Sequence, residues 1–173
     1  MKALVGRIFA VWYFCITLGR VRGTSYILRS PSLLRVSRGA SVSIGRGVMI
    51  DKGARIVVKQ TLHIGDRVFI GKNATLIAFA PLRIDEEVLM GENVSVHTED
   101  HGPAEDRLTF SSAPVSIGRR AWLGAGVVVT KGTTVGSDAT VGANAVVTRD
   151  ISPRTTAVGI PAREVGKRAS SSR

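Results

Sequence analysis

The sequence predicts an all-β solenoid, a chain wound into stacked coils whose sides are short strands. Three observations support this prediction. An aliphatic residue followed by a small or polar one recurs about every six positions, a period of neither an α-helix nor a single half-buried strand. These hexads fall into groups of three, as expected for a repeat whose units stack. The composition includes 19 glycines and only 5% aromatic residues, which suits a narrow core.

The hexads predict which side chains point inward. Their first positions are Ile44, Ile50, Ile64, Ile70, Ile84, Met90, Ile117, Leu123, Val135 and Val141. Six extended residues span roughly 20 Å, so three such sides close a triangular coil of about 18 residues. We expect each first residue to stack on its counterpart one coil away and the small fifth residue to fill a corner. The glycine that often follows the first residue is expected to permit a corner dihedral angle that a β-carbon would penalise.

The spacing of the hexads predicts the register between coils. Before residue 97 the spacing is twenty, which aligns Val36 with Ile56, and a two-residue outward kink per coil accounts for the difference from eighteen. We expect His63 to lie in one of these kinks. After residue 117 the spacing tightens to eighteen, as from Ile117 to Val135. Residues 98–114 break the pattern and are expected to protrude as a loop, a feature that is often functional in compact repeats.

The charge and the first residues suggest an anionic surface as a partner. The net charge is +11, and residues 1–50 hold eight basic and no acidic side chains. Residues 8–18 are apolar but too few to span a bilayer. We expect residues 1–23 to form a helix that lies at a membrane interface or caps the open solenoid end, with an uncleaved signal peptide or anchor as a third alternative. No nucleic-acid motif occurs, and a lone Cys15 excludes an internal disulfide.

The predicted organisation is therefore one domain with two short flanking segments. Residues 1–23 form the N-terminal helix, residues 24–160 the solenoid with its loop at 98–114, and residues 161–173 a basic C-terminal tail. Nothing in the first segment resembles a cleavage site for a signal peptidase. We expect a cytoplasmic protein that can lie against the inner face of the membrane.

Residues 44–167 resemble the hexapeptide-repeat acyltransferases, in the branch of galactoside and maltose acetyltransferases and polysaccharide O-acetyltransferases. Segment 114–127 with Trp122, segment 147–153 and the Gly-Ile-Pro-Ala-Arg ending at 159–163 carry the resemblance. It implies a left-handed parallel β-helix and a homotrimer whose active sites lie between neighbouring subunits. It also implies an enzyme that transfers an acetyl group from acetyl-CoA to a hydroxyl group without a metal.

This chemistry needs a base, because a sugar hydroxyl is a poor nucleophile near neutral pH, and histidine suits that role. The chain has three histidines, His63, His97 and His101. His101 falls where the family carries its catalytic histidine, and His97 is a second candidate or a surface residue. The carboxylates that could orient the base are Asp100, Glu99, Asp85 and Glu86, which the sequence does not rank; a solvated loop acid is the alternative for Glu99.

The resemblance also assigns the rest of the site. The backbone N–H of Ala125 is the expected donor to the oxyanion that forms during acyl transfer. The predicted contacts to coenzyme A are Trp122, Gly124, Gly142, Ala143, Thr148, Arg149, Arg163 and Lys167, and those to the acceptor are Asn73, His97 and Asp100. Alternatives stay open for five of them. Trp122 could pack against a neighbouring subunit, Asn73 could serve only as a corner turn, and Arg149, Arg163 and Lys167 could be solvated surface charges.

The N-terminal segment departs from the soluble sugar acetyltransferases, which carry a helical segment there that helps to bind a small sugar. Here that region is short, apolar and basic. We therefore expect the acceptor to be a sugar hydroxyl in a glycan or glycolipid precursor built on a membrane lipid, and not a free galactoside or maltose.

Two other functions fit parts of the sequence. The gamma-type carbonic anhydrases use a similar solenoid with three histidines on a metal, and His63, His97 and His101 have a compatible spacing. A scaffold that docks to a membrane or a partner is the non-enzymatic alternative. Metal analysis tests the first alternative, and retained function after His101→Ala would support the second.

Overall fold

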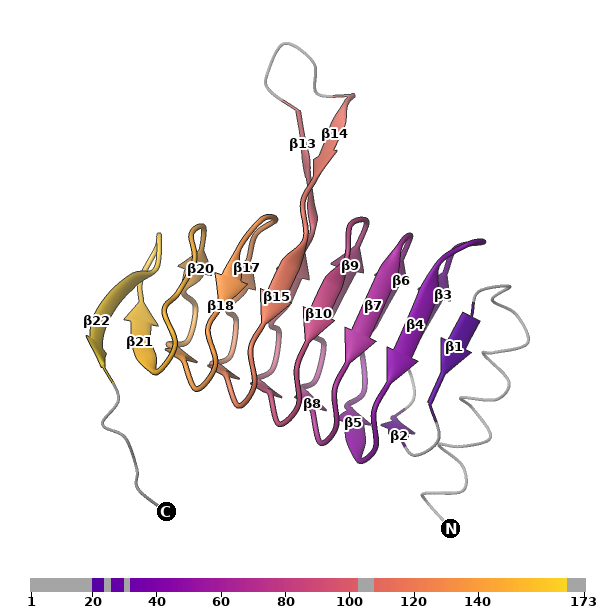
Figure 1. The fold of residues 1–173 in the computed structure, drawn as a ribbon, viewed down its shortest axis with the longest axis horizontal. Coiled ribbons are helices and arrows are strands. Elements are labelled where there is room, and N and C mark those ends of the chain that lie inside the picture. Colours follow the sequence, from indigo (N-terminus) through magenta and orange to yellow (C-terminus); the bar gives the residue numbers. More distant parts are fainter. Residues whose placement is uncertain (1–19, 24–25, 30–31, 103–107, 168–173) are drawn as a thin grey trace.

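The computed structural model describes residues 20–23, 26–29, 32–102 and 108–167, which form a parallel β-solenoid of stacked coils (Figure 1). Each coil contributes one strand to each of three sheets, here named A, B and C in the order in which the chain passes through them. The predicted all-β solenoid is confirmed. The predicted N-terminal helix falls mostly outside the described residues, but its last part is wrong, because Arg20–Arg22 form strand β1.

The strands are short and follow the hexads. Sheet A contains β1 (Arg20–Arg22), β4 (Ser41–Ile44), β7 (Thr61–Ile64), β10 (Leu82–Ile84), β15 (Val115–Ile117) and β18 (Thr134–Val135). Sheet B contains β2 (Tyr26–Leu28), β5 (Val48–Ile50), β8 (Phe69–Ile70), β11 (Leu89–Met90), β16 (Trp122–Leu123), β19 (Thr140–Val141), β21 (Thr155–Val158) and β22 (Arg163–Lys167). Sheet C contains β3 (Leu33–Val36), β6 (Arg55–Val58), β9 (Thr75–Ala78), β12 (Ser95–His97), β17 (Val128–Val129) and β20 (Val146–Val147). A hairpin of β13 (Glu99–His101) and β14 (Phe110–Ser112) stands apart from them.

The core is a set of aliphatic stacks that run along the solenoid axis. Ile64 is aligned with Ile44 on one side and with Ile84 on the other, and Ile117 with Ile84 and Val135. These side chains are almost fully removed from water, as are the small residues at the fifth hexad position. Burial of such apolar area is the main favourable term in folding. The predicted stacks are therefore confirmed.

The register of the first coil differs from the prediction. Val36 pairs with Val58, and it is Leu34 that pairs with Ile56. The reason is a longer turn after β3, where the backbone N–H of Ala40 bonds to the carbonyl of Ser37 at 3.0 Å. Residues 37–40 occupy the place that only residues 59 and 60 occupy one coil later. The spacing is thus twenty-two at this step, two more than the hexads suggested.

Glycine after the first hexad residue has a different cause from the one predicted. In these coils the left-handed backbone conformation occurs two positions later, at Arg67 (φ 56°) and at Asn73 (φ 57°), and not at Gly65. A β-carbon on Gly65 would instead lie 2.5 Å from the backbone nitrogen of Glu86 in the next coil. Close approach of successive coils therefore selects glycine here.

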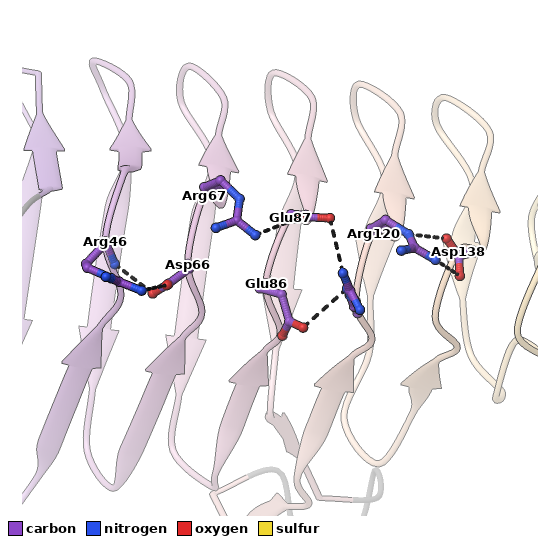
Figure 2. A network of polar contacts seen from close by, with 8 residues as sticks. Arg46, Asp66, Arg67, Glu86, Glu87, Arg120 and Asp138 are labelled. Carbon is purple, nitrogen blue, oxygen red and sulfur yellow. Dashed lines mark hydrogen bonds and ion pairs between the residues drawn. The ribbon is translucent and has the colours of Figure 1, made fainter. Parts of the chain in front are cut away.

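The corner between sheets A and B carries a ladder of ion pairs between successive coils (Figure 2). Its pairs are Arg46–Asp66, Arg67–Glu87, Glu86–Arg119, Glu87–Arg119 and Arg120–Asp138. The backbone N–H of Arg46 and then its guanidinium lower the pKa of the Asp66 carboxyl. A hydrogen bond from Arg67 likewise lowers the pKa of Glu87. The ladder thus favours the charged forms of its acids.

The corner between sheets C and A varies in length and holds the hairpin, which projects from the solenoid in Figure 1. Residues 98–114 were predicted as a loop, and the described part of this loop pairs as antiparallel strands β13 and β14. Thr98 anchors its base. Its buried hydroxyl oxygen accepts the backbone N–H groups of Phe79 and Ala80 at 2.8 and 2.9 Å, and its proton goes to the carbonyl of Ile77.

The C-terminal end of sheet B closes with a reversed strand. β22 runs antiparallel to β21, so part of the predicted tail at 161–173 belongs to the folded domain. Within the described ranges no helix is long and apolar enough to cross a membrane.

Candidate functional site

A pocket of about 390 Å³ lies at the foot of the hairpin, where β13 and β14 meet the outer face of sheet C. Its lining consists of His97, Glu99, Asp100, His101, Phe110, Thr130 and Lys131. Three predicted site residues therefore come together here: His101, His97 and Asp100. Two imidazoles, two carboxylates and one ammonium group face the same space, an arrangement that can bind polar substrates and move protons.

His101 is exposed on β13 and packs against an aromatic ring of the opposite strand. The ring centroids of His101 and Phe110 lie 4.6 Å apart. The backbone N–H of His101 donates to the Asp100 carboxylate at 2.8 Å, and the other oxygen of Asp100 lies 3.6 Å from the Lys131 ammonium. The hairpin thereby presents the predicted base at the pocket while its backbone is held by neighbouring groups.

An aromatic contact links the hairpin to sheet C. The Phe110 ring lies 6.3 Å from that of Phe79, and the Lys59 ammonium sits 4.4 Å from the centre of the Phe79 ring. Aromatic pairs and cation–π contacts of this kind each favour one arrangement of the groups involved. Through Phe110, which packs against His101, they link the hairpin to sheet C.

His97 was considered as a possible surface residue, but both nitrogens of its ring have neighbours within hydrogen-bond distance. Its Nε2 lies 2.6 Å from the Ser95 hydroxyl and its Nδ1 3.1 Å from a carboxylate oxygen of Glu99. The Glu99 side chain is only 15% exposed, so the alternative of a solvated loop acid is wrong. Of the carboxylates considered for orienting a base, Glu99 contacts an imidazole, and that imidazole belongs to His97.

Asp85 and Glu86 lie elsewhere. Asp85 is 2.7 Å from the Arg83 guanidinium, and Glu86 is 3.3 Å from that of Arg119 in the ladder of Figure 2. They belong to the A–B corner, whereas the hairpin leaves from the C–A corner.

The predicted contacts to coenzyme A divide into separate groups. Trp122 is half exposed on the outer face of sheet B, and Ala125 follows at the corner between sheets B and C. Gly124 is closely packed, since a β-carbon there would lie 2.7 Å from the backbone nitrogen of Ala143. Among the described residues, the backbone N–H groups of Ala125 and Ala143 have no hydrogen-bond acceptor. Both could donate to a ligand, whereas the equivalent backbone N–H of Lys52 at this corner donates to the Asp51 carboxylate at 2.8 Å.

Sheet C separates this group from the hairpin. Ala125 precedes strand β17 and Thr130 follows it, which places them roughly 17 Å apart at the rise of an extended chain. His101 and Ala125 therefore lie at opposite edges of sheet C within one chain. Thr148 and Arg149 follow β20 at the same corner as the hairpin, beyond the coil that contributes Lys131.

The remaining predicted residues lie further away along the chain. Arg163 begins β22 at the end of sheet B and is exposed, with one guanidinium N–H donated to the Ala162 carbonyl at 2.9 Å. The backbone of Lys167 ends the same strand. Gly142 precedes Ala143 at the B–C corner. Asn73 occupies that corner in a left-handed conformation, and its amide donates to Asn93 at 3.4 Å. The corner-turn alternative for Asn73 thus describes its observed conformation.

His63 does not lie in an outward kink, as the sequence suggested. It belongs to β7 on sheet A, where its Nδ1 lies 2.8 Å from the Ser43 hydroxyl, because the kink precedes this strand. His97 belongs to sheet C, so one chain does not bring the three histidines together. In the described ranges no group of three His, Cys, Asp or Glu side chains could hold a metal ion.

Sequence reasoning missed several residues of the pocket. Thr130 and Lys131 come from the coil after the hairpin, and Phe110 from its returning strand. The hexad count from Ile117 through Leu123 to Val129 could have placed Thr130 beside His97, because Val129 pairs with Val96. No signal in the sequence distinguished Phe110, since strand pairing within the loop was not predicted.

Comparison with known proteins agrees with this architecture. Residues 62–96 and 114–149 match the model of the hexapeptide repeat of succinyl-transferase. These two segments of the chain are thus similar to that repeat. Over 54 residues, or 31% of the chain, it is 37% identical to the galactoside O-acetyltransferase of Escherichia coli, of which the match covers 27%. The matched part of the chain spans about a quarter to a third of the length of the curated relatives that it matches.

Solved structures share the fold of this chain. A maltose O-acetyltransferase from Clostridium difficile 630 is 25% identical, with a TM-score of 0.64 over 88% of this chain and 72% of that one. The N-acyltransferase AntD from Bacillus cereus, in complex with dTDP and 3-hydroxybutyryl-CoA, has a TM-score of 0.77 over 92% and 88% at 16% identity. The predicted resemblance to the galactoside and maltose acetyltransferase branch is confirmed.

Proposed function

We propose that this chain is an acetyl-CoA-dependent O-acetyltransferase that modifies a sugar hydroxyl in a glycan or glycolipid precursor. The observation that carries the proposal is the pocket at the foot of the hairpin, where His101 and His97 face a space bounded by Lys131. Its position on a hexapeptide solenoid, and the similarity to a galactoside O-acetyltransferase and a maltose O-acetyltransferase, support acetyl transfer.

In this proposal His101 acts as general base. Its neutral imidazole takes the proton of the acceptor hydroxyl as that oxygen attacks the thioester carbonyl of acetyl-CoA. The C–S bond then breaks, and the imidazolium returns the proton to the departing thiolate. The backbone N–H of Ala125, which has no acceptor among the described residues, donates to the oxyanion.

The site would be completed by a second copy of the chain. His101 and Ala125 lie at opposite edges of sheet C, too far apart to act on the same carbonyl within one chain. A homotrimer with its sites between subunits would join the hairpin of one copy to the B–C corner of the next. Trp122 and Arg163, which are exposed on sheet B and at its end, would then contact the pantetheine and the phosphates.

The basic N-terminal segment, residues 1–50, favours an acceptor on an anionic surface. The first 50 residues contribute eight of the eleven net positive charges. Such a surface suits a lipid-linked glycan at the inner face of the membrane, where we place this cytoplasmic protein.

The first experiment measures acetyl-CoA binding and thioester cleavage by purified protein, with candidate glycan acceptors added in a second step. His101→Ala is expected to lower turnover by about 10² to 10⁴ while binding persists. Arg163→Ala is expected to weaken binding, and Arg55→Ala is its control, because Arg55 is an exposed arginine on β6, near the other end of the solenoid (Figure 1). Failure to bind acetyl-CoA would contradict the proposal.

Co-expression tests whether two copies share a site. His101→Ala and Trp122→Ala chains are each expected to be nearly inactive alone, and mixed trimers should recover part of the activity. Mixed assemblies with no more activity than the single variants, or a monomer with full activity, would contradict the shared site.

A further inference from the structure

Three functional groups lie beside the pocket at every second position of the chain, from β12 to the start of β13. Ser95 and His97 lie on β12, and Glu99 begins β13. The Ser95 hydroxyl is 2.6 Å from Nε2 of His97, and Nδ1 of His97 is 3.1 Å from the Glu99 carboxylate. A hydroxyl next to an imidazole that is itself oriented by a carboxylate is the arrangement of an activated nucleophile.

The contacts of His97 assign its tautomer. An ionised carboxylate can only accept, so the proton of the neutral imidazole is placed on Nδ1 toward Glu99. The lone pair of Nε2 then faces the Ser95 hydroxyl, which donates to it. The imidazole is thus positioned to take the proton of Ser95.

Sheet A offers an internal comparison. The Ser43 hydroxyl lies 2.8 Å from Nδ1 of His63, so a serine–histidine pair also exists there. Among the described residues, no carboxylate contacts that imidazole, and its register neighbour on the next strand is Arg83. The Ser43–His63 pair therefore lacks the carboxylate that completes the set on sheet C.

The surroundings of the two pairs differ as well. His97 and Glu99 line the pocket of about 390 Å³, together with Thr130 and Lys131, so a molecule held there can reach the imidazole. Ser95 is half-buried on β12, the strand that contributes His97 to the lining, and it lies next to the pocket without lining it. His63 does not line this pocket.

We propose that Ser95 is an autoacylation site, with His97 as its base and Glu99 as the group that orients the base. The Ser95 oxygen attacks the carbonyl carbon of an acyl donor, and the bond from that carbon to the leaving sulfur or oxygen breaks. His97 takes the serine proton and returns it to a thiolate leaving group. The physiological donor rests on the proposed function, because it would be the acyl-CoA of the transferase.

Acylation is expected to be slow and its product to persist. The backbone N–H of Ser95 is used in the sheet, where it donates to the carbonyl of Val127 at 2.8 Å. This amide cannot also stabilise an oxyanion on Ser95, which removes a contribution of about 10² to 10³ in rate. Hydrolysis of the ester lacks the same contribution. The expected result is therefore one stable acyl group per chain and not rapid turnover.

The test uses the purified full-length chain with two donors, acetyl-CoA and p-nitrophenyl acetate, followed by intact mass and peptide mapping. The second donor contains no coenzyme A. Its leaving group, p-nitrophenolate, departs as a stable anion, so the imidazolium of His97 then gives its proton to water. One acetyl group per chain is expected on Ser95. It should be absent in Ser95→Ala, and its rate of formation should fall about tenfold or more in Glu99→Gln, where the amide no longer fixes the tautomer.

Ser43→Ala is the matched control, because it removes the serine of the other pair and should leave the labelling of Ser95 unchanged. Acetyl on Lys131, or none on Ser95 with either donor, would overturn the proposal even if acetyl-CoA binds. Equal labelling of Ser43 and Ser95 would overturn the role of Glu99. Labelling of Ser95 by p-nitrophenyl acetate in a protein that does not bind acetyl-CoA would keep the site and contradict the proposed transferase function.

Discussion

The A–B corner and the C–A corner belong to the same coils, yet they are built in opposite ways. From the second coil onward, the A–B corner has a constant length, since the step from Ile64 to Ile70 and the step from Ile117 to Leu123 are both six residues. Its side chains pair from coil to coil (Figure 2). The C–A corner changes length from coil to coil and includes the hairpin at 98–114. The pocket lies beside the corner that varies.

The difference separates stability from function. A corner of constant length brings equivalent positions into contact, so a charge on one coil always meets the same neighbour on the next. A corner of variable length gives up these contacts, and its backbone can leave the solenoid without disturbing the stacks of the core. Functional residues are often carried by such segments on a rigid scaffold.

The largest expected effect is at a glycine of the constant corner. Gly65→Ala should lower the free energy of unfolding by about 3 kcal/mol, because its β-carbon would lie 2.5 Å from the backbone nitrogen of Glu86. Gly39→Ala in the variable corner meets no atom within 4 Å and only a left-handed φ of 83°, so about 1 kcal/mol is expected. Chemical denaturation followed by circular dichroism measures both. Equal losses would contradict the difference between the corners.

The next effect concerns the anchor of the hairpin. Thr98→Val should cost about 2 kcal/mol, since the buried amides of Phe79 and Ala80 both lose their acceptor. Thr133→Val is the control, because its hydroxyl makes one bond, to the Thr130 carbonyl at 2.8 Å, and about 1 kcal/mol is expected. Thermal unfolding compares the two, and hydrogen exchange of the hairpin amides should rise only in Thr98→Val. Unchanged exchange would show that the hairpin is held by other contacts.

The smallest effect is a dependence of stability on acid. The folded-state pKa values of Asp66 and Glu87 lie below their ordinary values because of Arg46 and Arg67. Their contribution is therefore present above about pH 4.5, the ordinary range of carboxyl groups, and is lost as the pH falls through the lowered values. Glu87→Gln should flatten the fall in stability between about pH 5 and pH 3, where the acid limb of this titration lies.

Glu92→Gln is the control for this titration. Glu92 is exposed at the B–C corner and makes no ion pair with a described residue. Added salt should also flatten the profile of the unmodified protein, because the ladder is solvent-exposed. A profile that is the same for both variants would assign the acid sensitivity to groups outside the ladder.

The sequence was informative where the coils repeat. The stacks from Ile44 to Val135 could be predicted because a six-residue period has one inward position, and each large residue there must be buried. The prediction that Val36 pairs with Ile56 was wrong because the turn after β3 is longer than the later ones, and the spacing of hydrophobic residues does not indicate turn length. Arg67 shows why the left-handed corner residue was wrongly expected to be glycine. It adopts the left-handed conformation although it has a side chain, and that side chain pairs with Glu87 of the next coil.

The site was predicted only in part, for a related reason. His101, His97 and Asp100 are close in sequence, and a protruding segment was enough to bring them to one pocket. Lys131 comes from another coil, and its contact with Asp100 depends on the path of the hairpin. The role of Glu99 depended on which way its side chain turns after β12, which no spacing rule determines.

The reversed strand β22 has a consequence for assembly from end to end. A parallel solenoid finishes in strand edges whose N–H and C=O groups can accept a further coil from another molecule. β22 pairs with β21 in the antiparallel sense and so covers that edge of sheet B with a strand of the wrong polarity for another coil. Without β22, the exposed edge of β21 would be a template on which molecules could add to one another as a growing filament.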